Sequence, residues 1–422
     1  MSGNEFGALA LPLLLLIASA QVLGYLFARA RQPRVIGEIL AGVVLGPSVL
    51  QRIAPGMAAL VFPVAGSGLG VKYAAVAGFL SNLGLLLLMF ASGAEADGLF
   101  RRDERRAVTW LGGVGTGLPF LIALAAAPFL PVGMMIGAAQ QTTSLVLVVG
   151  IAVAVTSIPV ISKILHDLDL LGTRFARLII GVAVVEDILL WCVLAIALAL
   201  AKSRAPLSGA TATHAAISIA YFVIGLTVLP RAVRWVTGLR ANLLVKSAPI
   251  AYVLSVLLAY AALAAALDVS GVFAAFLAGF AIVSDARLRP AAAALARVSF
   301  AVFIPVYFAM VGYQLSFGRG FSLGLTLGFI AAACVVKLAS AGAGARLAGF
   351  SWRASANLSI ALNARGGPGI VLATVAYDAE IINAGFYTTL VLLAIITSQM
   401  AGAWLAYVIR RGWPLLAAEP NH

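Results

Sequence analysis

Two adjacent carboxylates, Glu186 and Asp187, lie inside an apolar stretch that runs from about Leu178 to Leu200. A stretch of this length can cross a bilayer as a helix. Ionisable groups in hydrocarbon are costly, and they persist mainly where they face a bundle interior or a water-filled cavity. The pair therefore predicts a site that handles cations or protons. The alternative is a buried acid that only fixes a neighbouring helix.

The composition excludes a soluble globular protein. Of the 422 residues, 63% are hydrophobic and only 10% are charged, whereas soluble domains carry about 25% charged residues. The net charge of +13 is spread over short loops between apolar stretches, so we expect no nucleic-acid partner. Cys192 and Cys334 lie in apolar stretches without metal-ligand spacing. No Ser/His/Asp grouping or phosphate-binding loop is present, and we expect neither an enzyme nor a cofactor.

The hydropathy pattern predicts an all-α polytopic membrane protein surrounded by lipid, with about thirteen transmembrane helices. Each apolar run is bounded by charged or turn residues and is close to the length that crosses a bilayer. The runs cover residues 8–28, 35–50, 73–93, 107–130, 143–165, 178–200, 215–229, 248–267, 271–283, 298–315, 321–345, 354–377 and 384–409.

The basic residues predict the orientation of these spans. With thirteen crossings, 21 of the 28 lysines and arginines fall in the loops of one side, and five fall on the other. The positive-inside rule then places the N-terminus outside and the C-terminus in the cytoplasm. The first run has no basic n-region and no clear cleavage site, so we interpret it as a retained helix. The absence of a targeting sequence suggests a bacterial inner membrane.

A short internal sequence similarity suggests inverted repeats. The triplet Leu-Ala-Gly at 40–42 in the second run recurs at 277–279 in the ninth, and residues 89–93 of the third run resemble 307–312 of the tenth. An offset of seven spans is odd, so the copies would enter the membrane in opposite directions. Inverted repeats occur in many secondary transporters, although matches this short also arise by chance.

Two spans carry helix breakers near their middle. Thr156, Ser157 and Pro159 interrupt the fifth span, and the run 364–369, Ala-Arg-Gly-Gly-Pro-Gly, interrupts the twelfth. Proline removes a backbone donor and clashes with the preceding turn, which frees carbonyls that transporters use to coordinate cations. We predict two discontinuous helices at corresponding positions of the repeats. A simple proline kink is the alternative for each.

Two basic residues, Lys337 and Arg365, also lie within spans. At about 1.5 Å per helical residue, Thr156, Asp187 and Lys337 all lie about 15 Å from the cytoplasmic boundary, near the middle of the membrane. Lys337 is too deep to reach water by snorkelling, and we expect Glu186 or Asp187 as its partner. We expect Arg365 to neutralise the carbonyl end of a half-helix, with Asn363 and Pro159 at the same breaks.

Taken in order, these motifs resemble the monovalent cation:proton antiporters of the NapA, Kef and plant CHX type. The resemblance runs from about residue 8 to residue 411. It rests on residues 35–48 (Val-Ile-Gly-Glu-Ile-Leu-Ala-Gly followed by Leu-Gly-Pro-Ser), 85–95, 156–165, 185–187, Lys337 and 363–366.

The resemblance implies a sodium/proton antiporter fold of thirteen helices with two crossed, broken helices. It implies a homodimer, with a dimerisation part at about 8–65 and 215–283 and a core part at about 73–200 and 298–411. The ion-binding aspartate falls on Asp187, its preceding acid on Glu186 and the core lysine on Lys337, with Thr156 and Ser157 at the break. Such proteins exchange Na⁺, K⁺ or Li⁺ for protons by moving the core in an elevator-like manner.

Two departures from the family pattern bear on function. Relatives commonly carry Asp-Asp or Asn-Asp where this chain has Glu-Asp, which bears on ion size and stoichiometry. If cation entry breaks a Glu186–Lys337 pair, the desolvated lysine would release its proton, and two protons would exchange for one cation. We also expect no C-terminal nucleotide-binding domain of the Kef type.

Two other functions stay open at this stage. A Kef-like potassium efflux channel would conduct cations without compensating proton flux. An organic-anion symporter of similar fold would use Lys337 and Arg365 as anion ligands, but the adjacent carboxylates would repel an anion.

Overall fold

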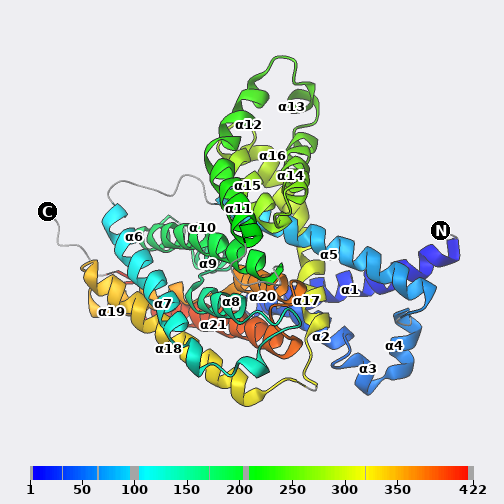
Figure 1. Ribbon diagram of the computed structural model, residues 1–422, viewed down its shortest axis with the longest axis horizontal. Coiled ribbons are helices and arrows are strands. Elements are labelled where there is room, and N and C mark those ends of the chain that lie inside the picture. Colours follow the sequence, from blue (N-terminus) through cyan, green and yellow to red (C-terminus); the bar gives the residue numbers. More distant parts are fainter. Residues whose placement is uncertain are drawn as a thin grey trace. The chain divides into compact units, whose positions relative to one another are not determined.

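The computed structural model describes residues 3–30, 32–63, 66–95, 104–170, 172–202, 209–318 and 320–416, and this part of the chain is helical (Figure 1). Long apolar runs favour helices in a bilayer, because a helix satisfies every backbone group within one segment. Several helices begin at side-chain caps. Ser322, Ser351 and Asn383 each accept a hydrogen bond from a backbone amide three residues further on.

Each of the thirteen predicted spans has a helical counterpart among the described residues. Ten helices are long and apolar enough to cross a membrane, and a bent pair, 216–227 with 229–238, forms a further candidate. Two shorter apolar helices, Thr142–Ala154 and Gly271–Val283, match the fifth and ninth spans. The predicted all-helical membrane fold is confirmed.

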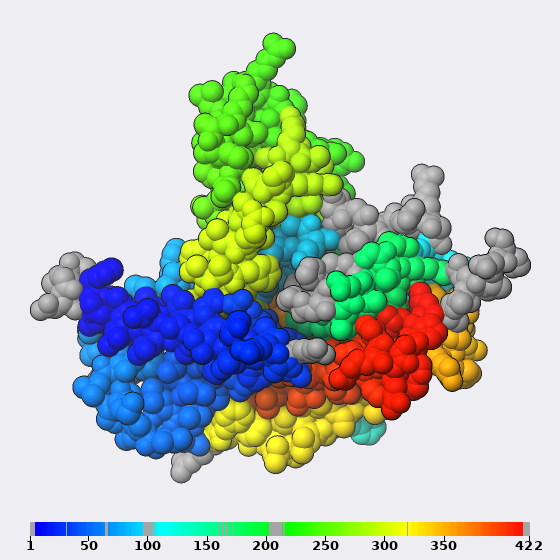
Figure 2. All heavy atoms as spheres, turned by 180° about the vertical axis from the view of Figure 1, so that it is seen from behind, coloured from blue at the N-terminus to red at the C-terminus, as the bar shows by residue number. Residues whose placement is uncertain are grey.

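The chain divides into two compact units, and the first combines residues 1–97 with 221–318. In this unit the N-terminal helices α1, α2, α3 and α4 form the continuous blue surface of Figure 2. Its helices are α1 (Gly3–Arg29), α2 (Arg34–Leu45), α3 (Leu50–Ile53), α4 (Pro55–Val61), α5 (Gly68–Glu95), α12 (Leu229–Gly238), α13 (Leu243–Ser247), α14 (Pro249–Ala266), α15 (Gly271–Val283), α16 (Arg289–Val298), a π-helical turn (Ser299–Phe303) and α17 (Ile304–Gln314).

Two helix pairs in the first unit cross in close contact, α2 with α17 and α5 with α15. A Cβ atom on Gly42 would lie 1.7 Å from the carbonyl oxygen of Ala309, and one on Gly312 would lie 1.9 Å from that of Ile39. In the second pair, a Cβ atom on Gly93 would lie 1.9 Å from the carbonyl oxygen of Phe276, and one on Gly279 would lie 2.0 Å from that of Phe90. Only glycine permits such approaches of two backbones.

The two crossings are related to one another by sequence. The offset that relates Gly42 to Gly279 also relates Ile39 to Phe276. The offset that relates Gly93 to Gly312 likewise relates Phe90 to Ala309. Each glycine–carbonyl contact in one crossing therefore has an equivalent in the other, as an internal two-fold relation between the halves of the unit would require. The residues involved include the short repeated segments seen in the sequence.

The second unit combines residues 98–220 with 319–422, and α11 (Gly209–Thr227) extends across its boundary. The predicted division into a dimerisation part and a core part stays a prediction. The compact units have other boundaries, since they group 73–97 and 298–318 with the first unit. The remaining helices are α6 (Arg105–Gly112), a π-helical turn (Gly113–Gly117), α7 (Leu118–Ala125), two 3₁₀ turns (Ala127–Phe129 and Val132–Met134), α8 (Thr142–Ala154), α9 (Ile158–Asp167), α10 (Arg174–Lys202), α18 (Leu323–Leu347), α19 (Trp352–Leu362), α20 (Gly366–Asp378) and α21 (Ala384–Arg410).

Candidate ion-binding site

The two predicted breaks are interruptions of regular helix, and they lie against each other in the second unit. Residues 155–157 separate α8 from α9, and residues 363–365 separate α19 from α20. The backbone amide of Ser157 donates to the carbonyl of Ala364 at 2.7 Å. The hydroxyl of Thr156 donates to the carbonyl of Leu362 at 2.5 Å. Each break therefore provides partners for polar groups of the other.

Glycine is needed where the breaks meet. Gly366 has a φ of +36°, and a Cβ atom there would lie 2.3 Å from Cγ2 of Val160 and 2.8 Å from Oγ of Ser157. The backbone amides at the start of α20 have side-chain partners, because Thr397 accepts from the amide of Arg365 and Ser398 from that of Gly366. These contacts fix the second break without a regular helical turn.

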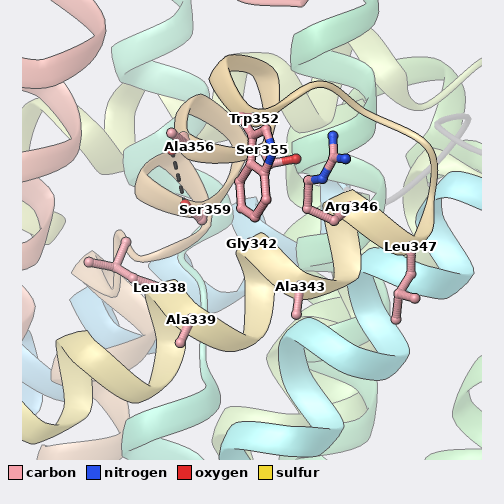
Figure 3. A pocket seen from close by; sticks show the side chains of 10 residues that line it. All are labelled: Leu338, Ala339, Gly342, Ala343, Arg346, Leu347, Trp352, Ser355, Ala356 and Ser359. Carbon is pink, nitrogen blue, oxygen red and sulfur yellow. Dashed lines mark hydrogen bonds between the residues drawn. The ribbon is translucent and has the colours of Figure 1, made fainter.

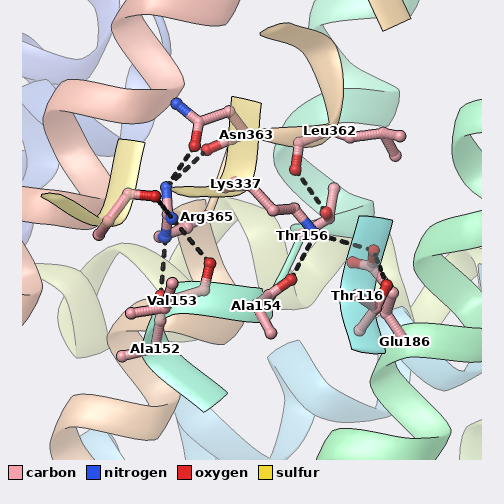
Figure 4. Close-up of polar contacts among 11 residues, drawn as sticks. Thr116, Ala152, Val153, Ala154, Thr156, Glu186, Lys337, Leu362, Asn363 and Arg365 are labelled. Carbon is pink, nitrogen blue, oxygen red and sulfur yellow. Dashed lines mark hydrogen bonds and ion pairs between the residues drawn. The ribbon is translucent and has the colours of Figure 1, made fainter. Parts of the chain in front are cut away.

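The guanidinium of Arg365 is fully buried and binds the carbonyl end of α8 (Figure 4). Its Nε donates to the carbonyl of Ala152 at 2.7 Å, and a terminal nitrogen donates to Val153 at 2.8 Å and to Ala333 of α18 at 3.1 Å. The other terminal nitrogen donates to Oδ1 of Asn363 at 2.7 Å. A cation at a helix C-terminus is stabilising, and these contacts are the ones that the predicted role of Arg365 requires.

Lys337 and Glu186 form an ion pair in which both side chains are fully buried. The lysine Nζ lies 2.9 Å from Oε1 of Glu186 and also donates to the carbonyl of Ala154, the last residue of α8 (Figure 4). The same Oε1 accepts a hydrogen bond from the hydroxyl of Thr116. Of the two acids proposed as partners of Lys337, the structure selects Glu186.

Thr116 is a site residue that the sequence interpretation missed. It lies in the π-helical turn Gly113–Gly117, between α6 and α7, and its side chain is buried. Single π-helical turns inside α-helices occur frequently at functional sites. The signal available in the sequence was the glycine-rich run 112–117, Gly-Gly-Val-Gly-Thr-Gly, in an otherwise apolar span.

Among the residues that the structure describes, Asp187 is a buried acid without a hydrogen-bond partner. Its side chain is 1% exposed, and neither carboxylate oxygen has a hydrogen-bond partner within the described residues. Oε2 of Glu186 is also unpartnered there. Burial of a carboxylate that lacks a hydrogen bond is expensive. A proton or a bound cation on Asp187 would remove that cost, so the arrangement fits a substrate-binding group.

The other predicted site residues take these positions. Ser157 is buried, and its Oγ accepts from the amide of Val160 at 3.3 Å. No hydrogen bond joins Thr156 or Ser157 to Asp187 in the described part of the chain. Pro159 falls in the first turn of α9, and its side chain lies outside the described residues. The ion-binding roles of these residues stay predictions.

A buried carboxylate without a hydrogen-bond partner among the described residues lies next to a lysine–carboxylate pair, and two interrupted helices are in contact. This arrangement is the one expected of a monovalent cation:proton antiporter of the membrane. The sequence model of the family described as "Sodium/hydrogen exchanger, transmembrane" matches residues 14–411. The chain belongs to this family. It is an integral membrane transporter and not an enzyme.

Characterised relatives extend over nearly the whole chain. The Na(+)/H(+)-K(+) antiporter GerN of Bacillus cereus is 26% identical over 93% of this chain and 94% of its own length. The Na(+)/H(+) antiporter NhaS4 of Synechocystis is 27% identical over 92% and 93%. Cation/H(+) antiporter 18 of Arabidopsis thaliana is 29% identical, but the chain spans only 47% of its length.

A solved structure is similar in fold. The sodium proton antiporter MjNhaP1 from Methanocaldococcus jannaschii superposes with a TM-score of 0.60 over 96% of this chain and 97% of its own, at 16% sequence identity. The predicted sodium/proton antiporter fold is therefore confirmed.

Proposed function

We propose that this protein is a secondary active antiporter that exchanges Na⁺ or K⁺, or Li⁺ in their place, for protons at Asp187. The observation that carries the proposal is the buried carboxylate of Asp187, whose oxygens have no hydrogen-bond partner within the described residues. The names of the relatives GerN and NhaS4, which include Na⁺, K⁺ and H⁺, support these ions as the substrates.

Competition for one carboxylate couples the two fluxes. Asp187 can hold a proton or a cation but not both, and the hydrocarbon surroundings disfavour the charged, empty state. The carboxylate therefore crosses the membrane occupied in either direction. A cation needs further oxygen ligands, and discontinuous helices of secondary transporters commonly supply them from backbone carbonyls.

The Glu186–Lys337 pair sets the expected stoichiometry. If the pair stays intact when a cation binds, one proton exchanges for one monovalent cation, and transport is electroneutral. If an arriving cation displaces Lys337 from Glu186, the lysine releases a second proton, and two protons move for each cation. We propose the second, electrogenic cycle, because a cation held by Asp187 and the adjacent Glu186 competes with the ammonium of Lys337 for the Glu186 carboxylate.

The division into two units supports an elevator-like mechanism, in which the second unit carries the site across the membrane relative to the first. Fluorescent labels on Ser247→Cys and Arg353→Cys, one in each unit, should report a distance that changes when Na⁺ is added. An unchanged distance in a transporting protein would contradict this part. We further propose a homodimer in a bacterial inner membrane, with the N-terminus outside and the C-terminus in the cytoplasm.

Proton flux in sealed proteoliposomes tests the exchange. Na⁺, K⁺, Li⁺ or choline is added outside vesicles that contain a pH dye. The native chain should release protons with one or more alkali cations and not with choline, and Asp187→Asn should abolish the signal. Asp268→Asn is the matched control, because Asp268 is exposed and has a φ of +56°, which asparagine tolerates.

Two outcomes would favour the alternatives. Cation current without proton movement would favour an efflux channel, and proton movement with organic anions alone would favour a symporter. A voltage-sensitive dye then distinguishes electrogenic from electroneutral exchange. Glu186→Gln should convert an electrogenic exchange into an electroneutral one, and an unaltered voltage signal in this variant would contradict the role of the pair.

A further inference from the structure

A groove of about 600 Å³ lies between α18 and α19 within the second unit (Figure 3). Small side chains of both helices create it, because Gly, Ala and Ser leave the space between the two helix backbones unfilled. The small residues that line it are Ala339, Gly342, Ala343, Ser355, Ala356 and Ser359.

The two serine hydroxyls that line this groove need no hydrogen bond from a ligand. The hydroxyl of Ser359 donates to the carbonyl of Ala356 at 3.0 Å, and that of Ser355 donates to the carbonyl of Phe350 at 3.5 Å. Both hydroxyls are therefore satisfied within the protein. A hydrocarbon chain could fill the groove without leaving either group unpaired.

One end of the groove carries a positive charge and an aromatic ring. The guanidinium of Arg346 lies 4.7 Å from the ring centroid of Trp352 and donates to the carbonyl of Phe350. Trp352 is 76% exposed. Tryptophan is enriched at the membrane–water interface, and arginine at a helix end reaches toward lipid headgroups. This end therefore matches the level of the headgroups.

The length of the groove matches one leaflet. It extends along α18 from Leu338 to Arg346, which corresponds to about 12 Å at the helical rise per residue. Half of the hydrocarbon core is about 15 Å thick. The groove thus begins at the headgroup level and continues into the hydrocarbon of a single leaflet.

We propose that this groove binds one anionic phospholipid, with an acyl chain along the small residues and the phosphate on Arg346. The charge of Arg346 selects an anionic headgroup, as basic pockets between membrane helices do. The site adjoins the transport machinery. Leu338 lines the groove, whereas the preceding residue, Lys337, is buried and binds Glu186. A bound lipid holds α18 against α19 beside that pair.

Native mass spectrometry of the full chain in detergent measures the binding directly, independently of transport. Phosphatidylglycerol or phosphatidylcholine is titrated, and the first bound lipid is counted. Gly342→Leu should fill the groove and lower the affinity for phosphatidylglycerol at least tenfold. An added Cβ at Gly342 meets only Ser359, at 4.0 Å. Gly328→Leu is the control on the same helix, since no atom lies within 4 Å of its Cβ position.

The headgroup is tested by a second matched pair. Arg346→Gln should weaken phosphatidylglycerol binding about fivefold, the effect of one basic residue at a membrane surface, and should leave phosphatidylcholine unchanged. Arg353→Gln removes an exposed charge from the first turn of α19, at a residue that does not line the groove. This control should bind phosphatidylglycerol like the native chain.

Trp352 lines the groove and provides a measurement that does not depend on filling it with a larger side chain. Phosphatidylglycerol with brominated acyl chains should quench the tryptophan fluorescence of the native chain more than that of Trp352→Phe. Brominated phosphatidylcholine should show a smaller difference between these two proteins.

Four results would overturn the proposal. They are equal affinity for the two lipids, equal weakening by Arg346→Gln and Arg353→Gln, no quenching assigned to Trp352, or a change of oligomeric state in Gly342→Leu without a change in lipid binding. The last result would assign the groove to a second copy of the chain.

Discussion

The ammonium of Lys337 lies 2.9 Å from the carboxylate of Glu186, and both side chains are fully buried. The two groups come from α18 and α10, so this contact joins the two halves of the second unit's sequence. Asp187 follows Glu186 directly and has no hydrogen-bond partner within the described residues. Adjacent acids in one helix thus have different surroundings, and we expect them to respond differently to substitution.

Loss of Lys337 alone should destabilise the protein. Lys337→Met leaves the charge of Glu186 buried and unpaired, which costs about 3–5 kcal/mol in comparable buried pairs. The double variant Glu186→Gln with Lys337→Met removes both charges and should recover most of that loss. Thermal unfolding in detergent measures both variants against the native chain. A double variant that is as unstable as Lys337→Met would show that the charge pair is not the cause.

Cation binding at Asp187 should appear as thermal stabilisation. At a cation concentration ten times the dissociation constant, binding to the folded state adds about 1.4 kcal/mol. The unfolding temperature of the native chain should therefore rise with Na⁺ or K⁺ and stay constant with choline. In Asp187→Asn the rise should disappear, although the protein stays folded. A rise that persists in this variant would place the cation elsewhere.

Thr116 should act as a positioning residue for Glu186. Thr116→Val keeps the shape of the side chain but removes the donor to a charged oxygen, a hydrogen bond worth about 1.5–3 kcal/mol. We expect a lower unfolding temperature and a higher apparent KM for the cation. Thr116→Ser restores the hydroxyl and should behave like the native chain. If serine and valine have the same effect, the hydrogen bond is not responsible.

The crossing of α2 with α17 should not tolerate a methyl group. A Cβ atom on Gly42 would lie 1.7 Å from the carbonyl oxygen of Ala309, so Gly42→Ala must separate the two helices. We expect little folded, monodisperse protein by size-exclusion chromatography. Gly78→Ala in α5 is the control, because nothing lies within 4 Å of its Cβ position. This control should gain about 0.5–1 kcal/mol, since alanine favours helix more than glycine.

The fold was accessible from sequence because its signals are local. Hydropathy and loop charge identify membrane spans one at a time, and proline or glycine near the middle of a span indicates an interruption. The charged residues of the site were found for the same reason, since Glu186, Lys337 and Arg365 each stand out in an apolar run. Local signals therefore identified the helices and the chemical groups.

Pairing and unit boundaries depend on contacts that no local signal carries. Two acids were equally available to Lys337, and only the packing of α18 against its neighbours selects Glu186. Thr116 is a common residue type, and a π-helical turn has no distinct hydropathy pattern. The helices α5 and α17 belong to the first compact unit through their glycine contacts with α15 and α2, which hydropathy does not reveal.

The contacts of Arg365 have a consequence for ion selectivity. One guanidinium binds carbonyls of α8 and α18 as well as the side chain of Asn363 at the second break. The two interrupted helices cannot separate without breaking several charge-assisted hydrogen bonds away from water. In the proposed exchange cycle, the ligands offered to the substrate would therefore be the same whichever side of the membrane the site faces. The protein should discriminate among alkali cations equally well in import and in export.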